Sequence, residues 1–480
     1  MRAARTGQRA LTLAAALLVP ISGCRTPRPG ARHPVVVTGG PAWVGVTPAE
    51  QAGLQMLLAD LAATSGATVF EAGSPDDPGA RGLQRLALDG TRLPDGTLHL
   101  QGHLQTPGLP DQDVAPLTPD PDLQLQEILA AAGLRSPEAG AILPRAPEHL
   151  LPLADACGMA LAGNGATAAQ AEQAAADLEA AEPRNAPAAY ARGADLYLLL
   201  QAPGGPDLQS QSACAAELDR ALDLLRGYPR AAALAGRFHT DTGDQRRALA
   251  ILQEATARWP RAAGLWPALA YAARTTGLLD ISLSALQKED ALAGNLPEAA
   301  LLTRNSDLYA GEWDRFQTSL GTGTDERPDP MRDFYRGYIR LLRGHPEEAQ
   351  AFFRKAALPT SQSPPFQSLA MVYRLAIDGR RPEALLALRN LALSRHDARI
   401  PDGEFTFKLA EAFCFLAQPE EAMDTAQQAF SQGFGCTPWY ERAPLLAPLR
   451  GLPRWRALIS HLRARQLLLE AEFPAKAFGS

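Results

Sequence analysis

The stretch 229-PRAAALAGRFHTDTGDQRRALAILQEATARWP-260 decides how the rest of the chain is organised. It predicts two short helices that are joined by a tight turn at Gly243, with Gly236 allowing the two helices to approach closely. Apolar residues recur at helical spacing in its second half, at Ala248, Leu252 and Ala255. One such pair cannot bury its own apolar face, so neighbouring pairs must stack on it to form a continuous core.

The order of small, large and turn residues in this stretch resembles the tetratricopeptide repeat, whose period is about 34 residues. Counted from Pro229, the next unit begins at Ala263, and the sixth unit keeps the offsets of the third at Gly337 and Phe353. Large and small residues again take the repeat positions in the unit after Ala263, at Trp266, Leu269 and Ala270. The resemblance implies a superhelix of antiparallel helix pairs, whose concave surface is lined mainly by the first helix of each pair.

The region before the repeats has a different pattern. The β-branched run 35–37 predicts a strand, and leucines at helical spacing between 54 and 61 predict a helix after it. A second strand at 67–71 precedes two alternating segments, 85–91 and 97–106, which are separated by a hairpin turn. A further helix is expected at 122–132. This order is similar to the TolB amino-terminal-like domain, and that resemblance implies a role in interaction.

We therefore expect a mainly α protein, with a tetratricopeptide-like superhelix preceded by a small α/β domain. Its expected parts, in chain order, are a lipoprotein signal peptide (1–23), a tether (24–34), the small α/β domain (35–133), a linker (134–147), the tetratricopeptide-like repeats (148–432) and C-terminal capping helices (433–480).

The amino terminus resembles a bacterial lipoprotein signal. A basic start is followed by an apolar run, 10–21, which is shorter than the roughly 20 residues that span a bilayer. The run ends Ile21-Ser22-Gly23-Cys24, which resembles a lipobox and implies cleavage before Cys24 and lipid attachment to it. Arg25 follows, which in the familiar sorting rule indicates the outer membrane. The alternative is an ordinary signal peptide with a chance cysteine, which would leave a secreted or periplasmic soluble protein.

The remaining cysteines would lie in an oxidising compartment if the chain is exported. Cys157, Cys214, Cys414 and Cys436 show no C-x-x-C spacing, so a zinc or redox motif is not indicated. Cys414 is expected on a first helix and Cys436 just past the second, so the two could form a disulfide. The alternative is that all are buried free thiols.

Composition and motifs favour binding over catalysis. The chain of 480 residues has a net charge of −6, which argues against a general nucleic-acid binder. It contains no G-x-S-x-G elbow, no P-loop lysine motif and no H-E-x-x-H motif, so we expect no enzyme activity and no cofactor. His99 and His103 lie about 13 Å apart if they are on one strand, too far to share a metal ion.

The candidate partner-binding residues are Trp266, Arg332, Arg336, Tyr338 and Arg340. The arginines follow one face of the sixth pair's first helix, where they would either form a solvated face or bind an acidic or carboxylate-bearing peptide. The aromatic residues would either anchor the partner or pack in the core.

The expected function is that of a lipoprotein of the outer membrane which faces the periplasm and binds another envelope protein or peptide in the concave surface. The anchor on Cys24 would hold it to the membrane. One alternative is a structural subunit of an envelope assembly or secretion system, held by its convex face. Another is a ligand-binding or hydrolytic activity in the small domain.

Overall fold

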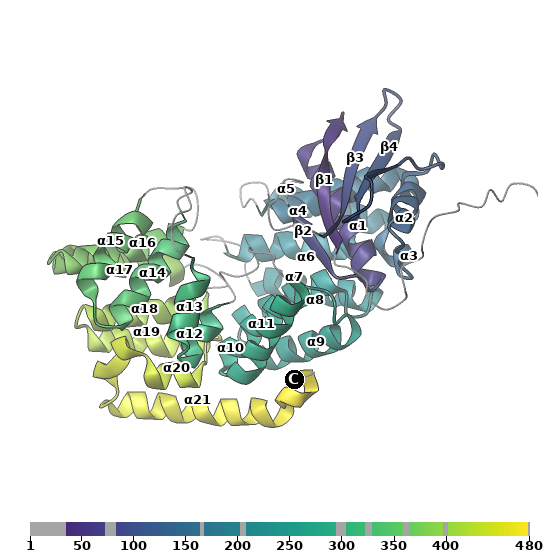
Figure 1. Cartoon of the computed structure of the whole chain (residues 1–480). Coiled ribbons are helices and arrows are strands. Elements are labelled where there is room, and N and C mark those ends of the chain that lie inside the picture. The colour runs from purple at the N-terminus through teal and green to yellow at the C-terminus, as the bar shows by residue number, and fades with distance from the viewer. Residues whose placement is uncertain are drawn as a thin grey trace, which may run out of the picture. The chain divides into compact units, whose positions relative to one another are not determined.

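The computed structural model describes residues 35–72, 83–163, 168–201, 208–293, 304–321, 329–358, 364–396 and 402–478 (Figure 1). The expected signal peptide and tether, including Cys24, lie outside the described residues. Within the described ranges, a small sheet region comes first and paired helices follow it.

The amino-terminal region contains a sheet with the strand order β2-β1-β3-β4-β5. β1 lies parallel to β2 and β3, and β3 and β4 form the predicted antiparallel hairpin. The strands are β1 (Val35–Val44), β2 (Val69–Ala72), β3 (Gln84–Arg92), β4 (Leu98–Gln105) and β5 (Gln112–Val114). Alternate residues of β4 are buried and exposed, because only one face of this strand packs against helices.

The sheet region is joined to the repeats by a close helix contact. Helix α1 (Pro48–Thr64) begins with a capping box on Thr47 and packs against α4 (Leu150–Ala162). A Cβ on Gly53 would lie 1.7 Å from the backbone oxygen of Ala154, so only glycine allows this approach. The hydrophobic core is consequently continuous from β1 through α4 to Ala231 in the third helix pair.

Eight antiparallel pairs follow one another in the described part of the chain. They are α4 with α5 (Ala168–Ala181), α6 (Ala186–Gln201) with α7 (Leu208–Leu224), α8 (Pro229–Asp241) with α9 (Gln245–Arg258), α10 (Leu265–Thr276) with α11 (Leu279–Ala293), α12 (Asn305–Ala310) with α13 (Trp313–Ser319), α14 (Pro330–Leu342) with α15 (Pro346–Ala356), α16 (Pro364–Ile377) with α17 (Arg381–His396), and α18 (Gly403–Phe415) with α19 (Pro419–Ser431). The shorter helices α2 (Pro121–Ala131) and α3 (Ala139–Ile142) precede them.

The pair α8–α9 shows why this sequence forms such units. The turn between the helices uses Gly243 at a φ of +87°, and Asp244 caps α9 by accepting a hydrogen bond from the backbone N–H of Arg247. A Cβ on Gly236 would lie 2.6 Å from the side chain of Leu252, so the glycine sets the spacing of the pair. These contacts confirm the predicted tetratricopeptide-like packing, and the small sheet region before it is also confirmed.

The carboxy-terminal segment connects distant pairs. It consists of α20 (Thr437–Arg442), the short 3-10 helix η3 (Pro444–Leu449), α21 (Pro453–Glu472) and a final 3-10 turn, η4 (Ala475–Phe478). α21 packs on α19 and α20, and its end reaches the core of the third and fourth pairs, where Leu469, Phe473 and Phe478 are buried (Figure 1). Arg246 of α9 also pairs with Glu472 at 2.6 Å.

In the described ranges, no helix is both long enough and apolar enough to cross a bilayer.

Candidate functional site

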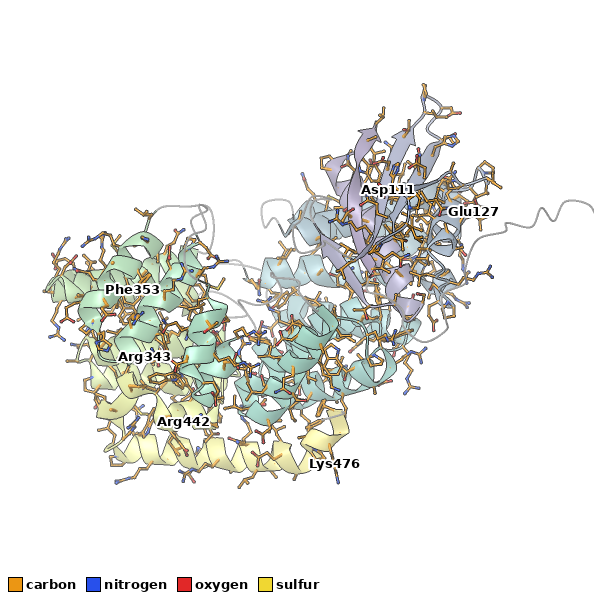
Figure 2. All side chains as sticks on the ribbon, in the orientation of Figure 1. Asp111, Glu127, Arg343, Phe353, Arg442 and Lys476 are labelled. Carbon is orange, nitrogen blue, oxygen red and sulfur yellow. The ribbon has the colours of Figure 1, made fainter. Side chains whose placement is uncertain are left out.

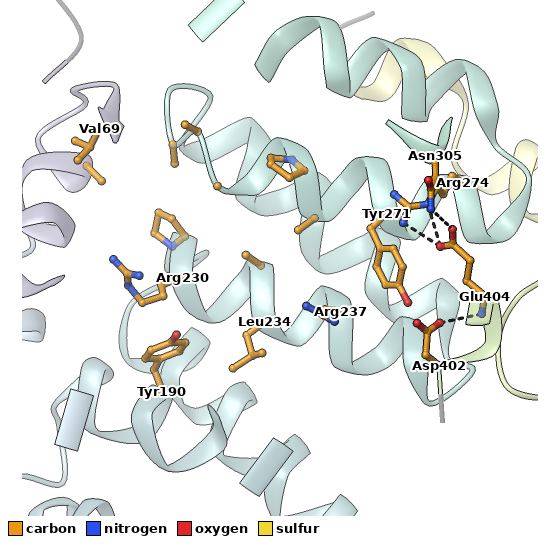
Figure 3. A pocket seen from close by; sticks show the side chains of 18 of the residues that line it. Val69, Tyr190, Arg230, Leu234, Arg237, Tyr271, Arg274, Asn305, Asp402 and Glu404 are labelled. Atoms are coloured by element: carbon orange, nitrogen blue, oxygen red, sulfur yellow. Dashed lines mark hydrogen bonds and ion pairs between the residues drawn. The ribbon is translucent and has the colours of Figure 1, made fainter. Parts of the chain in front are cut away.

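A cleft of about 470 Å³ lies on the first helices of several repeats (Figure 3). Its lining comes mainly from α8 and α10, with further residues from α1, α6, α12, α14, α16 and α18. First helices are therefore brought together, as the resemblance to tetratricopeptide repeats implied. The sheet region also contributes, through α1 and Val69, so the cleft is shared between the small domain and the repeats.

The apolar part of the cleft lining, here called the floor, consists mostly of small side chains. Its members are Ala59, Ala63, Ala233, Leu234, Ala263, Pro267 and Ala268. Because most of these side chains are small, the backbone of a bound segment can approach the helices closely. Pockets of this volume, with mostly apolar walls and a few polar groups, are typical of binding sites in proteins.

A buried carboxylate supports the wall formed by α8 and α10. The hydroxyl groups of Tyr197 and Tyr271 both donate to Asp241, whose pKa is raised to about 6, chiefly by burial. The Arg237 guanidinium lies beside the same carboxylate, with 3.7 Å between Nε and Oδ2. The ring of Tyr271 lies between two guanidinium groups, those of Arg237 at 6.0 Å and Arg274 at 4.8 Å from its centroid.

Glu404 connects three first helices at one end of the cleft. Its carboxylate accepts two hydrogen bonds from Arg274 of α10, at 2.9 and 3.1 Å, and one from Asn305 of α12 at 2.6 Å. The hydroxyl of Tyr309 adds another at 2.6 Å. Burial alone would raise the pKa of Glu404, but Arg274 and Lys408 lower it below its ordinary value. This carboxylate is thus held ionised inside the protein.

Lys408, one turn along α18, is enclosed by aromatic rings. Its Nζ lies 4.4 Å from the ring centroid of Tyr338 and 5.1 Å from that of Tyr335. Burial lowers the pKa of Lys408, while Glu411 and Glu404 oppose this shift. Glu411 in turn accepts a hydrogen bond from Tyr338 and has a pKa raised to about 7, chiefly by burial. The charged groups of Lys408 and Glu411 therefore contact side chains of the chain itself.

The predicted aromatic contacts lie in the core rather than on the cleft surface. Tyr338 is fully buried against Glu411 and Lys408, so its side chain does not face solvent. Trp266 is 5% exposed, and its ring N–H donates to the Pro260 carbonyl at 3.0 Å. Neither residue lines the cleft.

The predicted arginines of α14 bind groups of their own chain. Arg332 pairs with Asp329 at 3.5 Å, and Arg340 pairs with Glu348 at 3.3 Å. Arg336 donates to the carbonyl of Leu320 at 2.6 Å. The next arginine on this face, Arg343 (Figure 2), donates to Asp314. Arg336 and Arg343 therefore connect the sixth pair to the fifth, and none of the four arginines lines the cleft.

Sequence reasoning did not single out the charged residues that line the cleft. Arg230, Arg237, Arg274, Glu404 and Lys408 belong to three helices that are far apart in the sequence. Helix α8 has an amphipathic pattern, whereas α18 is buried from Gly403 to Cys414, charged residues included. The sequence held one indication of a charged residue in the cleft: Arg237 directly follows Gly236 on the first helix of the pair that best matches the repeat.

The cysteines and other potential ligands form no reactive cluster in the described part of the chain. Cys157, Cys214, Cys414 and Cys436 are buried free thiols, so the disulfide considered for Cys414 and Cys436 is not formed. Burial raises the pKa values of Cys414 and Cys436 to about 12, which makes both thiols poor nucleophiles. Among the described residues, no group of three or more acidic, histidine or cysteine side chains could hold a metal ion.

No protein-family model matches the sequence, and no curated protein matches it. Among solved structures, the chain is similar to one from the APC/C hetero-tetramer Cut9-Hcn1, with a TM-score of 0.41 and 12% identity, over 68% of this chain and 62% of that one. It is also similar to the TPR domain of P58(IPK), with a TM-score of 0.19 and 13% identity, over 67% of this chain and 98% of that one. The fold assignment rests on the helix pairs themselves.

Proposed function

We propose that this chain is a scaffold that binds a polypeptide segment of another envelope protein in the cleft on α8 and α10. We further propose that it is an outer-membrane lipoprotein facing the periplasm, with its lipid on Cys24. The observation that supports binding is the cleft itself, with a volume of about 470 Å³, an apolar floor and charged groups in its lining. The sequence Ile21-Ser22-Gly23-Cys24 supports the anchor.

Photo-crosslinking in the native cell tests the binding role. A benzoylphenylalanine residue would replace Leu234 or Ala268, which both line the cleft, and Leu386, which is 62% exposed on α17, as the control. We expect one envelope protein to be captured from both cleft positions and not from Leu386. If the chain is folded and membrane-bound but no protein is captured from either cleft position, the proposal is wrong.

A second candidate is a structural subunit of an envelope assembly, held by its second helices. It is favoured by Leu386 and Leu393, which are 62% and 65% exposed and lie two turns apart on one face of α17. Capture of a partner from Leu386, with none from the cleft positions, would support this candidate instead.

Metabolic labelling tests the anchor separately. An alkyne analogue of palmitate should label the wild-type chain and should not label a Cys24→Ala variant. The variant should also leave the membrane fraction. If the wild-type chain takes up no lipid, the protein is a secreted or soluble periplasmic protein and the cleft proposal stands alone.

A further inference from the structure

Most of the cations that line the cleft are already neutralised by neighbouring carboxylates. Arg230 binds Asp60, with 2.9 Å between Nη2 and Oδ1, and only 17% of its side chain is exposed. Arg274 is held by the buried carboxylate of Glu404, and Lys408 lies among tyrosine rings close to the same residue. These three cations are therefore committed to the structure of the chain.

Arg237 differs from them because its ion pair with Asp241 includes no hydrogen bond. Its side chain is 54% exposed although it lines the cleft, and its Nε lies 3.7 Å from Asp241, beyond hydrogen-bond distance. The oxygens of Asp241 already accept hydrogen bonds from Tyr197 and Tyr271. Among the residues that the structure describes, Arg237 consequently has guanidinium N–H groups that make no hydrogen bond. A guanidinium group with this geometry is suited to bind a carboxylate through two parallel bonds.

The carboxylate of Asp402, in the lining of the same cleft, disfavours a ligand with several negative charges next to Arg237. Asp402 also lines the cleft, and its negative charge acts on Arg237. The carboxylate of Asp402 caps α18 by accepting hydrogen bonds from the backbone N–H groups of Glu404 and Phe405. A run of acidic residues would bring a second carboxylate close to Asp402, and like charges at short range repel each other.

We propose that the segment bound in the cleft carries a single carboxylate that pairs with Arg237, next to an apolar side chain on the alanine-rich floor. Leu234 lies one helical turn before Arg237, so the apolar group of the ligand sits about 5 Å along α8 from the carboxylate. This inference rests on the proposed function, because it specifies the chemistry of the segment that the cleft binds.

Selection from a displayed library of random peptides tests the inference on the full chain. Wild type would be compared with Arg237→Gln, Arg237→Glu and, as a matched control outside the cleft, Arg340→Gln. We expect wild type and Arg340→Gln to enrich peptides with one acidic residue at a fixed distance from an apolar residue. Arg237→Glu should enrich a basic residue at that position, and Arg237→Gln should weaken binding of the wild-type peptides on the order of tenfold.

Circular dichroism would first establish that each variant is folded. Enrichment of acidic runs, or retention of the same acidic position by folded Arg237→Gln and Arg237→Glu, would overturn the inference. If wild type retains peptides that lack a carboxylate, the inference fails while the cleft remains a peptide-binding site. If wild type retains no peptide at all, the proposed function fails together with the inference.

Discussion

Replacing Glu404 with alanine should destabilise the protein by about 3–5 kcal/mol, because the change leaves a buried cation without its partner. The side chains of Glu404 and Arg274 are only 6% and 5% exposed. The Glu404 carboxylate accepts four hydrogen bonds, two from Arg274 and one each from Asn305 and Tyr309. Its removal takes the acceptor from all four donors, and water has little access to replace it. The loss is measured as the change in free energy of unfolding in urea, at neutral pH.

The matched control is Glu421→Ala. Glu421 pairs with Arg389, but these side chains are 36% and 52% exposed, so this substitution should cost at most about 1 kcal/mol. The double substitution Arg274→Met with Glu404→Leu should recover part of the stability, because it removes both buried charges but leaves Asn305 and Tyr309 without their acceptor. Equal losses for Glu404→Ala and Glu421→Ala would refute the reasoning, since burial would then have no effect on the energy of the pair.

Three further substitutions test burial and close packing. Burial raises the pKa of Asp195 to about 7, so the folded protein keeps this carboxyl protonated at pH values where the unfolded chain has lost the proton. Between roughly pH 4 and 7, wild type should therefore lose stability relative to Asp195→Asn by up to about 1.4 kcal/mol per pH unit. Equal pH slopes for the two proteins in denaturant titrations would contradict this. Gly53→Ala should lower the melting temperature, because the added Cβ would lie 1.7 Å from a backbone oxygen of α4. The control Gly140→Ala should not lower it, because no atom lies within 4 Å of the Cβ added there. Phe473→Ala should cost about 3–5 kcal/mol in urea unfolding, whereas Leu468→Ala, on the exposed side of α21, should change stability by less than about 0.5 kcal/mol.

The local order of the chain was predictable because it depends on neighbouring residues. Turn glycines such as Gly243 and the spacing of Gly236 and Leu252 specify a helix pair without reference to distant segments. The same holds for the hairpin of β3 and β4, whose turn includes Gly96 at a φ of +88°. The short edge strand β5 has too few residues to show an alternating pattern, and it was not predicted.

The site was less predictable, because its residues meet only through contacts between distant pairs. The sequence left open whether Tyr338 anchors a partner or packs in the core, and the choice depends on Glu411, 73 residues later, which accepts a hydrogen bond from its hydroxyl group in the core. Periodicity on one helix says which face is apolar, and it does not say whether the groove opposite that face is filled by another helix. For the same reason, the arginines of α14 and Arg237 could not be distinguished before their partners were known.

The contact between α21 and the third and fourth pairs has a consequence for how the protein folds and unfolds. In an open array each repeat touches only its neighbours, so the ends can unfold first and stability is close to a sum of local terms. Here Arg246 binds Glu472, 226 residues away, and Gln245 binds the carbonyl of Gly433 at 2.7 Å. These bonds connect the third pair to the segments that follow the eighth pair. We therefore expect the repeats to unfold cooperatively and not from the ends inward. Because closure needs residues that follow the eighth pair, it can be completed only after the whole repeat region has been made and, if the protein is exported, translocated.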